Sequence, residues 1–325
     1  MKKTSVASFL ASQGVLIALV LLILFGWLRY DNFLGLFNIS SVLRYNSMFA
    51  LVALGMCFVI MTGGIDLSVG GTAALGSVVS AMLSPYGMLI GTLGGVGAGL
   101  CIGLINGLVI VRMRILPFIA TLAAMLAAYG TALLLAKDQS VSVSYESGFT
   151  DLGQNDILYV PIPALIAAAL YIVGSIVLNY TSAGRTVLAI GGNEDASRLM
   201  GLPVNRVKFL VYVVSGGLAG LAGVVLASQT GAGQPTEGVG WELIAIASVV
   251  VGGTLLTGGL GSVGATLAGA MLLGLIYSVL NFENGYGFIS LSAYWQSVVR
   301  GVFLLIVVIL QSQLTGRAEQ TESSR

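Results

Sequence analysis

Long apolar runs, separated by short polar segments, dominate this chain of 325 residues. Most of these runs approach or exceed the length of about 20 residues with which an α-helix crosses the hydrocarbon core of a bilayer. They predict an all-α, polytopic membrane protein whose ten transmembrane helices form a single domain over residues 1–325. The third and eighth runs are short and rich in glycine, so we expect them to bend or to span only partly. The runs fall near 11–28, 42–62, 67–84, 88–111, 115–136, 160–179, 206–228, 241–257, 260–281 and 293–313.

The positions of lysine and arginine predict the orientation of the chain. With the N-terminus in the cytoplasm, the inner segments hold most of the 14 basic residues. Such an excess of positive charge is typical of cytoplasmic loops. An even number of spans then places the C-terminus in the cytoplasm as well. Arg300 lies within the tenth run, where it must snorkel, face a cavity or pair with an acid such as Asp66 or Glu242.

The composition excludes several classes of function. Hydrophobic residues make up 57% of the chain and charged residues 8%, and the net charge of +1 offers no basic face for nucleic acid. The chain has no histidine, which removes histidine-based zinc sites and most serine triads, so we predict neither a metal site nor a catalytic site. We interpret Cys57 and Cys101, both within apolar runs, as small buried residues and not as a redox pair.

The segment 182–205, predicted to be cytoplasmic, contains the signals of a short helix over 193–200. Asn193 is a favourable N-cap, and Glu194 suits the positive end of the helix dipole. Gly201 can adopt the left-handed conformation that ends a helix. Ala196, Leu199 and Met200 then share an apolar face. This face could lie on the membrane surface or insert into a cytoplasmic partner, and we favour the partner.

On the outer side, the segment 137–159 carries four acidic residues against one lysine. A solvated connector and a docking surface remain equally good interpretations of this segment.

The string Gly-Gly-Ile-Asp-Leu-Ser-Val-Gly at 63–70 places a carboxylate between two apolar runs. Because a charge at that depth is costly, Asp66 needs a cavity, water or a partner. It could line a solute pathway, cap a helix that starts near Leu67, or carry a proton. We favour capping together with pathway lining, because the sequence offers no second clearly intramembrane acid to relay a proton. Glu242, at the start of the eighth run, is either an interfacial helix start or a functional group.

A faint repeat divides the chain into two related halves. A shift of 189 residues places Gly63 and Gly64 on Gly252 and Gly253, and places Asp66 on Leu255. Transporters often contain two such halves with a pathway near their interface. Because the second half has Leu255 at the equivalent position, any role of Asp66 belongs to the first half alone.

Four blocks resemble the permease subunits of bacterial ABC importers for monosaccharides, the ribose/xylose/galactose-type branched permease family. The blocks follow the order of that family over most of the chain. They are Gly63–Gly70, Asn106–Gly107 with Pro117–Leu122, Ala189–Gly201 with Gly216–Gly223, and Glu242–Ala247 with Gly252–Thr254 and Gly258–Ser262.

The resemblance implies a multi-pass protein of the bacterial inner membrane that works in a pair, with a second copy or a paralogue. Each permease would sit on an ATPase subunit, and a periplasmic binding protein would deliver the sugar. The chain contains no P-loop, so ATP and Mg²⁺ belong to the partner, and this chain is expected to bind no cofactor. The short helix 193–200 matches the segment that docks into the ATPase. The residues expected there are Asn193, Glu194, Ala196, Leu199, Met200 and Gly201. The residues expected along the pathway are Thr62, Gly63, Gly64, Asp66, Ser68, Asn106, Thr121 and Glu242.

Two other classes of function stay open on the residues alone. A proton-coupled secondary sugar transporter is the main alternative. An intramembrane aspartyl hydrolase would need two facing aspartates, and Asp66 stands alone among the apolar runs. The sequence leaves open the identity of the sugar (pentose, hexose, furanose form, autoinducer sugar or nucleoside) and whether the pair is a homodimer or a heterodimer.

Overall fold

The computed structural model describes residues 6–286 together with residues 295, 298, 301, 302 and 305. The predicted tenth span and both predicted cytoplasmic termini fall largely outside this range, as does Arg300. The helices are α1 Val6–Arg29, α2 Leu36–Met61, α3 Val69–Leu83, the 3-10 turn Ser84–Tyr86, α4 Met88–Arg112, α5 Pro117–Ala136, α6 Asp151–Gln154, α7 Ile162–Tyr180, α8 Ser182–Gly192, α9 Glu194–Leu199, α10 Val204–Thr230, α11 Trp241–Val251 and α12 Val263–Tyr286. The strands are β1 Val141–Ser142, β2 Asp156–Ile157, β3 Val160–Pro161 and β4 Ala232–Gly233.

Helices occupy the first nine predicted spans, which confirms a mainly helical membrane protein. Six of the described helices, α2, α4, α5, α7, α10 and α12, are long and apolar enough to cross a membrane. Helices α3 and α11 have 15 and 11 residues. At a rise of 1.5 Å per residue they reach about 22 Å and about 16 Å, short of a hydrocarbon core of about 30 Å. The count of ten spans stays a prediction.

The eighth predicted span was too long, because α11 ends at Val251 and not near 257. Gly253 takes a φ of +85°, and its N–H bonds to the carbonyl of Val250. The N–H of Thr254 bonds to the carbonyl of Val249. These two bonds form a Schellman end, which glycine favours because it has no side chain to clash in the left-handed region.

The same helix end closes α2, at Gly63, whose φ is +77°. The N–H of Gly63 bonds to Ile60 and that of Gly64 to Val59. The two ends therefore correspond with a shift of 190 residues, one more than the sequence comparison predicted. The shift of 189 residues matches both glycines, whereas the shift of 190 places Gly63 on Gly253 and Gly64 on Thr254, so the backbone conformation and not the glycine pair identifies the equivalent residue.

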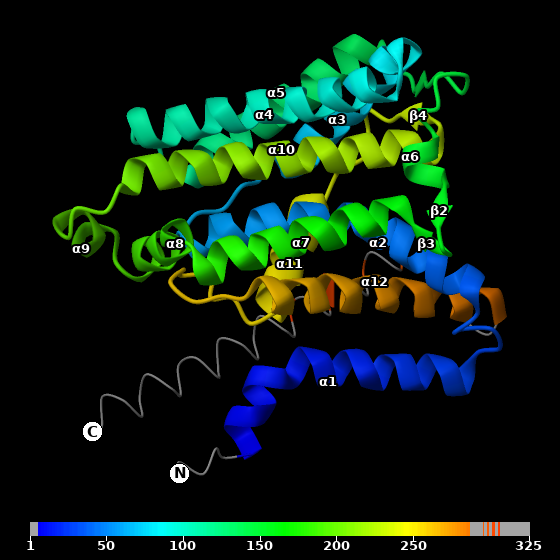
Figure 1. Ribbon diagram of the computed structural model, residues 1–325, viewed down its shortest axis with the longest axis horizontal. Coiled ribbons are helices and arrows are strands. Elements are labelled where there is room, and N and C mark those ends of the chain that lie inside the picture. Colours follow the sequence, from blue (N-terminus) through cyan, green and yellow to red (C-terminus); the bar gives the residue numbers. More distant parts are fainter. Residues whose placement is uncertain (1–5, 287–294, 296–297, 299–300, 303–304, 306–325) are drawn as a thin grey trace.

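Helix α10 lies at the centre of the bundle, against α2, α3 and α4 (Figure 1). Glycines at four-residue spacing on α4, including Gly99 and Gly103, face Gly216 and Gly220 on α10. A Cβ atom at Gly103 would lie 2.9 Å from the Cα of Val213, and one at Gly220 would lie 2.6 Å from the carbonyl oxygen of Gly95. Small residues thus let the two backbones approach, as is common between membrane helices.

The two ends of the bundle differ in structure. Helices α8 and α9 lie at one end, and α6 with the strands lies at the other (Figure 1). Strand β1 pairs with β4, and β2 pairs with β3, both antiparallel. Arg44 of α2 forms an ion pair with Asp156 of β2, which ties the acidic segment 137–159 to the bundle.

Two expectations about local structure were wrong. Residues 182–192, treated as part of a loop, form α8, whose N-cap Thr181 accepts a hydrogen bond from the N–H of Gly184. Cys57 is buried, as predicted, but Cys101 is exposed on α4. A helix with a glycine stripe buries only that stripe, so its opposite side is open whatever residue occupies it.

Candidate functional site

Asp66 lies in the connection between α2 and α3 and is completely buried. Its Oδ1 accepts hydrogen bonds from the backbone N–H of Ser68 at 3.0 Å and from the Ser68 hydroxyl at 2.6 Å. Its Oδ2 accepts from the hydroxyl of Ser215, on α10, at 2.8 Å. Three donors therefore face this carboxylate and offset part of the cost of removing it from water.

Two further helices hold the same connection. The amide of Asn106, on α4, donates to the hydroxyl oxygen of Ser68 at 2.8 Å. The hydroxyl oxygen of Thr121, on α5, accepts from the N–H of Leu67 at 3.1 Å. We call Asp66, Ser68, Asn106, Thr121 and Ser215 the Asp66 network. It joins the 62–68 connection to α4, α5 and α10, and each member is at most 1% exposed.

The predicted capping role of Asp66 was wrong by two residues. Helix α3 begins at Val69 with Ser68 as its N-cap, and its first helical bond runs from Thr72 N–H to Ser68 O. The N–H groups of Leu67 and Ser68 are instead bound by side chains, of Thr121 and Asp66. Because the carboxylate and the hydroxyl hold these two residues outside the helix, Asp66 lies before the cap.

The other predicted residues of this connection serve its turn. The Thr62 hydroxyl donates to the Val59 carbonyl at 2.7 Å, and Gly63 supplies the left-handed residue that ends α2. Gly64 makes room for the Tyr212 hydroxyl, which is buried and has no hydrogen-bond partner among the described residues. Neither Ser215 nor Tyr212 was predicted from the sequence. The sequence offers one weak indication of them: both carry a hydroxyl group and lie shortly before the Gly216-Gly217 pair, within an apolar stretch of α10.

Glu242, the remaining predicted residue, lies apart from the Asp66 network in the first turn of α11. Its Oε2 and the Tyr129 hydroxyl are both buried, and neither has a hydrogen-bond partner among the described residues. Both atoms approach Gly70, where a Cβ would lie 2.8 Å from the carboxylate oxygen and 3.0 Å from the hydroxyl. The structure therefore groups Glu242 with Tyr129 of α5.

Helix α9 protrudes at one end of the bundle and has a complete set of end contacts. The Asn193 side chain accepts from the N–H of Ala196 at 2.9 Å, which confirms the predicted N-cap. At the other end, Gly201 has a φ of +77°. The N–H groups of Gly201 and Leu202 bond to Arg198 and Ser197, which forms a Schellman end. A helix of six residues needs such contacts, because short helices are unstable alone.

Glu194 connects α9 to α10. Its carboxylate accepts from Lys208 at 2.8 Å and from Arg198 at 2.7 Å. Partial burial raises the pKa of the Glu194 carboxyl, but the hydrogen bonds and charges of Lys208 and Arg198 outweigh this effect, so the pKa lies below its ordinary value. A lowered pKa means that the pairing is complete above the ordinary pKa of a glutamate. It is lost only as the pH falls through the lower value.

The apolar residues of α9 are left uncovered. Leu199 is 89% exposed and Met200 is 68% exposed, while Ala196 is partly buried. A hydrophobic side chain held outward on a capped helix at the end of a bundle is suited to insertion into another protein. Among the described residues, no group of three histidine, cysteine, aspartate or glutamate side chains could hold a metal ion.

Comparison with known proteins identifies the family of this chain. Residues 38–308 match the family described as "Branched-chain amino acid transport system / permease component". The chain belongs to this permease family. It is therefore a transport component and a multi-pass protein of the bacterial inner membrane, and the six long apolar helices among the described residues agree with a multi-pass protein.

Curated members of the family are similar to this permease over nearly their whole length. The ribose import permease of Haemophilus influenzae is 35% identical, over 95% of this chain and 95% of its own. That of Bacillus subtilis is 37% identical, over 91% of each chain. The L-arabinose permease of Escherichia coli K12 is 36% identical, over 91% of this chain and 89% of its own. No solved structure matches the chain.

Proposed function

We propose that this permease is the membrane subunit of an ATP-driven importer for a monosaccharide. The observation that carries the proposal is its similarity, over nearly the whole chain, to permeases named for ribose and L-arabinose. In this proposal ATP and Mg²⁺ bind to a separate ATPase subunit, because the chain has no P-loop. The permease itself binds no cofactor.

The geometry of α9 supports the presence of the ATPase partner. Leu199 and Met200 protrude from a helix whose two ends and one flank are fixed by hydrogen bonds and ion pairs. A rigid helix can transmit a displacement of the ATPase to the bundle. Through α10, α9 is linked to Ser215 of the Asp66 network. We therefore propose that α9 is the coupling helix and faces the cytoplasm, together with both chain termini.

The pathway in this proposal passes beside the 62–68 connection. Transporter sites often lie where a membrane helix is interrupted and polar groups meet its ends. The network is closed to solvent in this conformation, and a change of conformation would open it. We propose the same eight residues as pathway residues, and a second copy or a paralogue as the other wall. They are Thr62, Gly63, Gly64, Asp66, Ser68, Asn106, Thr121 and Glu242.

Purification of the tagged permease in a mild detergent tests the proposed assembly. We expect a protein with a P-loop to co-purify in a ratio of one to one, and mass spectrometry to show either one permease species or two. A sugar-binding protein should join the complex when it is added with D-ribose or L-arabinose. Recovery of the permease alone in several detergents would contradict an ATP-driven importer and favour a self-sufficient secondary transporter.

A further inference from the structure

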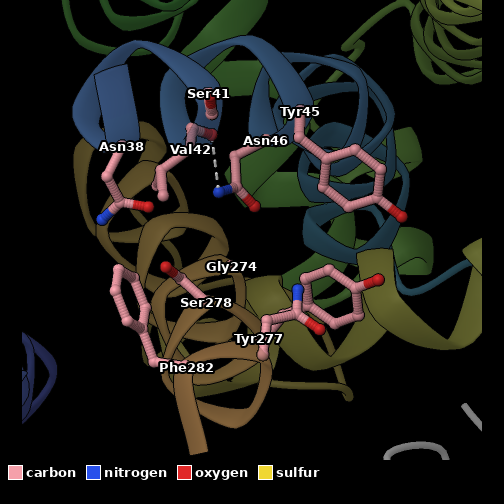
Figure 2. Close-up of a pocket in the computed structure, with 10 residues that line it drawn as sticks. Asn38, Ser41, Val42, Tyr45, Asn46, Gly274, Tyr277, Ser278 and Phe282 are labelled. Carbon is pink, nitrogen blue, oxygen red and sulfur yellow. Dashed lines mark hydrogen bonds between the residues drawn. The ribbon is translucent and has the colours of Figure 1, made fainter. Parts of the chain in front are cut away.

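A cavity of about 530 Å³ lies between the first half of α2 and the second half of α12. Asn38, Tyr45 and Asn46 line it from α2, and Tyr277, Ser278 and Asn281 line it from α12. On α2 the adjacent pair Tyr45 and Asn46 lies about two helical turns from Asn38, and on α12 the adjacent pair Tyr277 and Ser278 lies about one turn from Asn281, so each set shares one side of its helix. Figure 2 shows Asn38, Tyr45 and Asn46 on one side of the cavity and Tyr277 and Ser278 on the other. A second cavity of about 240 Å³ adjoins it and shares Tyr45, Asn46 and Tyr277.

The lining combines amides and hydroxyls with aromatic rings. The Asn38 amide donates to the Phe33 carbonyl at 2.7 Å, and the Asn46 amide donates to the Val42 carbonyl at 2.8 Å. These bonds fix the direction of both amide groups before any ligand arrives. The rings of Tyr45 and Tyr277 are nearly parallel, with centroids 5.5 Å apart, and form an aromatic wall.

Polar side chains in a membrane bundle are costly unless they have partners, and they mark pathways for polar solutes. Among the described residues that line the cavity, none is charged. A charge-free lining is poorly suited to a phosphate or to a zwitterionic amino acid, each of which needs an opposite charge. It suits a neutral molecule with several hydroxyl groups and an apolar C–H face, which can pack on an aromatic ring. The volume falls within the range of small-molecule sites.

The position of the cavity relates it to the end of the bundle opposite α9. Arg44 lies on α2 between the cavity residues Ser41 and Tyr45. It forms an ion pair with Asp156 and also donates a hydrogen bond to the Gly153 carbonyl. The cavity therefore lies at the end of the bundle that holds the acidic segment 137–159. In the proposed orientation this end faces the periplasm.

We propose that this cavity is a binding site for a neutral monosaccharide on the periplasmic side of the permease, separate from the Asp66 network. This inference rests on the proposed function and adds to it the residues that receive the sugar. Asn38, Asn46 and Asn281 bind hydroxyl groups, Ser278 adds a further hydroxyl, and the Tyr45–Tyr277 wall packs against the C–H face of the ring.

Uptake of radiolabelled D-ribose and L-arabinose by cells that express the complete importer tests the site. We expect Asn281→Ala to lower uptake at limiting sugar by roughly three- to tenfold, the effect of losing one hydrogen bond. Ser278→Leu, which fills part of the cavity, should lower it at least as much. Asn179→Ala is the matched control, because Asn179 is exposed on α7 and bonds to Ser175 of its own helix. It should transport at the wild-type rate.

A labelling experiment separates sugar binding from a general loss of structure. In the purified complex, Asn281→Cys in a Cys101→Ser background should react with a polar maleimide, because residue 281 is exposed and lines the cavity. The sugar that is imported should slow this reaction by roughly threefold or more, while the buried Cys57 stays unlabelled. If the wild-type complex imports sugar and the cavity variants import it equally well, the proposed site is wrong. It is also wrong if no sugar slows the labelling. Either result would leave the importer proposal standing. A wild-type complex that imports no monosaccharide would overturn both.

Discussion

Asp66 shows how a single carboxylate can organise a helix break. Both of its oxygens are bound, to Ser68 on one side and to Ser215 on the other, and the residues between Gly63 and Ser68 are held outside any helix. The network thereby joins α3 to α10 without a cation among its members. Because Asp66 binds both helices, the network can keep α3 and α10 together when the permease changes conformation.

Asp66→Ala should destabilise the protein and impair uptake without releasing the ATPase. The substitution leaves the hydroxyls of Ser68 and Ser215 without their acceptor, at a cost of about 1–3 kcal/mol. Thermal unfolding in detergent, uptake and ATPase co-purification would be measured together. The matched control is Asp31→Ala, since Asp31 is exposed in the turn between α1 and α2. Uptake at the wild-type rate in Asp66→Ala would remove this residue from the mechanism.

Helix α9 is stable because of its contacts and not because of its length. The Asn193 cap, the Schellman end at Gly201 and the pairing of Glu194 with Lys208 fix a helix of six residues whose outer side chains are largely exposed among the described residues. The arrangement separates two tasks, since polar residues hold the helix and apolar residues are left for the partner.

Replacing Leu199 and Met200 together by aspartate should release the ATPase while the permease stays folded in the membrane. Both side chains are exposed, so the change costs the permease little, but two charges would have to be buried in the partner. Co-purification of the tagged variant measures the effect, and we expect a loss of at least tenfold. Leu158→Asp is the control, because Leu158 is also 89% exposed but lies at the opposite end. Undiminished co-purification of the double variant would exclude α9 as the coupling helix.

The bundle as a whole depends on close contact between α4 and α10. Gly99 and Gly103 on α4 and Gly216 and Gly220 on α10 let the backbones touch, and α10 in turn holds α2 and α3. Since lipid is as apolar as the helices, packing and not burial from water drives this association.

Gly99→Val should therefore destabilise the folded permease by about 1–3 kcal/mol or more, through overpacking at the helix contact. Gly97→Val, on the same helix, is the matched control, because a Cβ at Gly97 meets nothing within 4 Å. Size-exclusion chromatography and the melting temperature in detergent would compare the two variants. Equal stability would show that the α4–α10 contact can relax without loss.

The sequence pattern was sufficient to predict the features that depend on residues close together in the chain, which are the long helices and the helix caps. Apolar runs located nine helices because a bilayer requires length and hydrophobicity within one segment. Asn193, Glu194 and Gly201 predicted α9 because caps act within one or two turns. Residues 182–192 were missed as a helix because their composition does not differ enough from that of a loop.

Tertiary structure alone decided which distant residues meet. Ser215 lies 149 positions from Asp66 and binds its carboxylate, and Tyr129 approaches Glu242 from another helix. The cavity between α2 and α12 likewise combines two faces more than 200 positions apart. A serine or asparagine in an apolar helix carries no sign of its partner, because hydrogen bonds depend on distance in space. The sequence by itself therefore determined the class of protein and the helices of its apolar runs, and packing decided which residues form the sites.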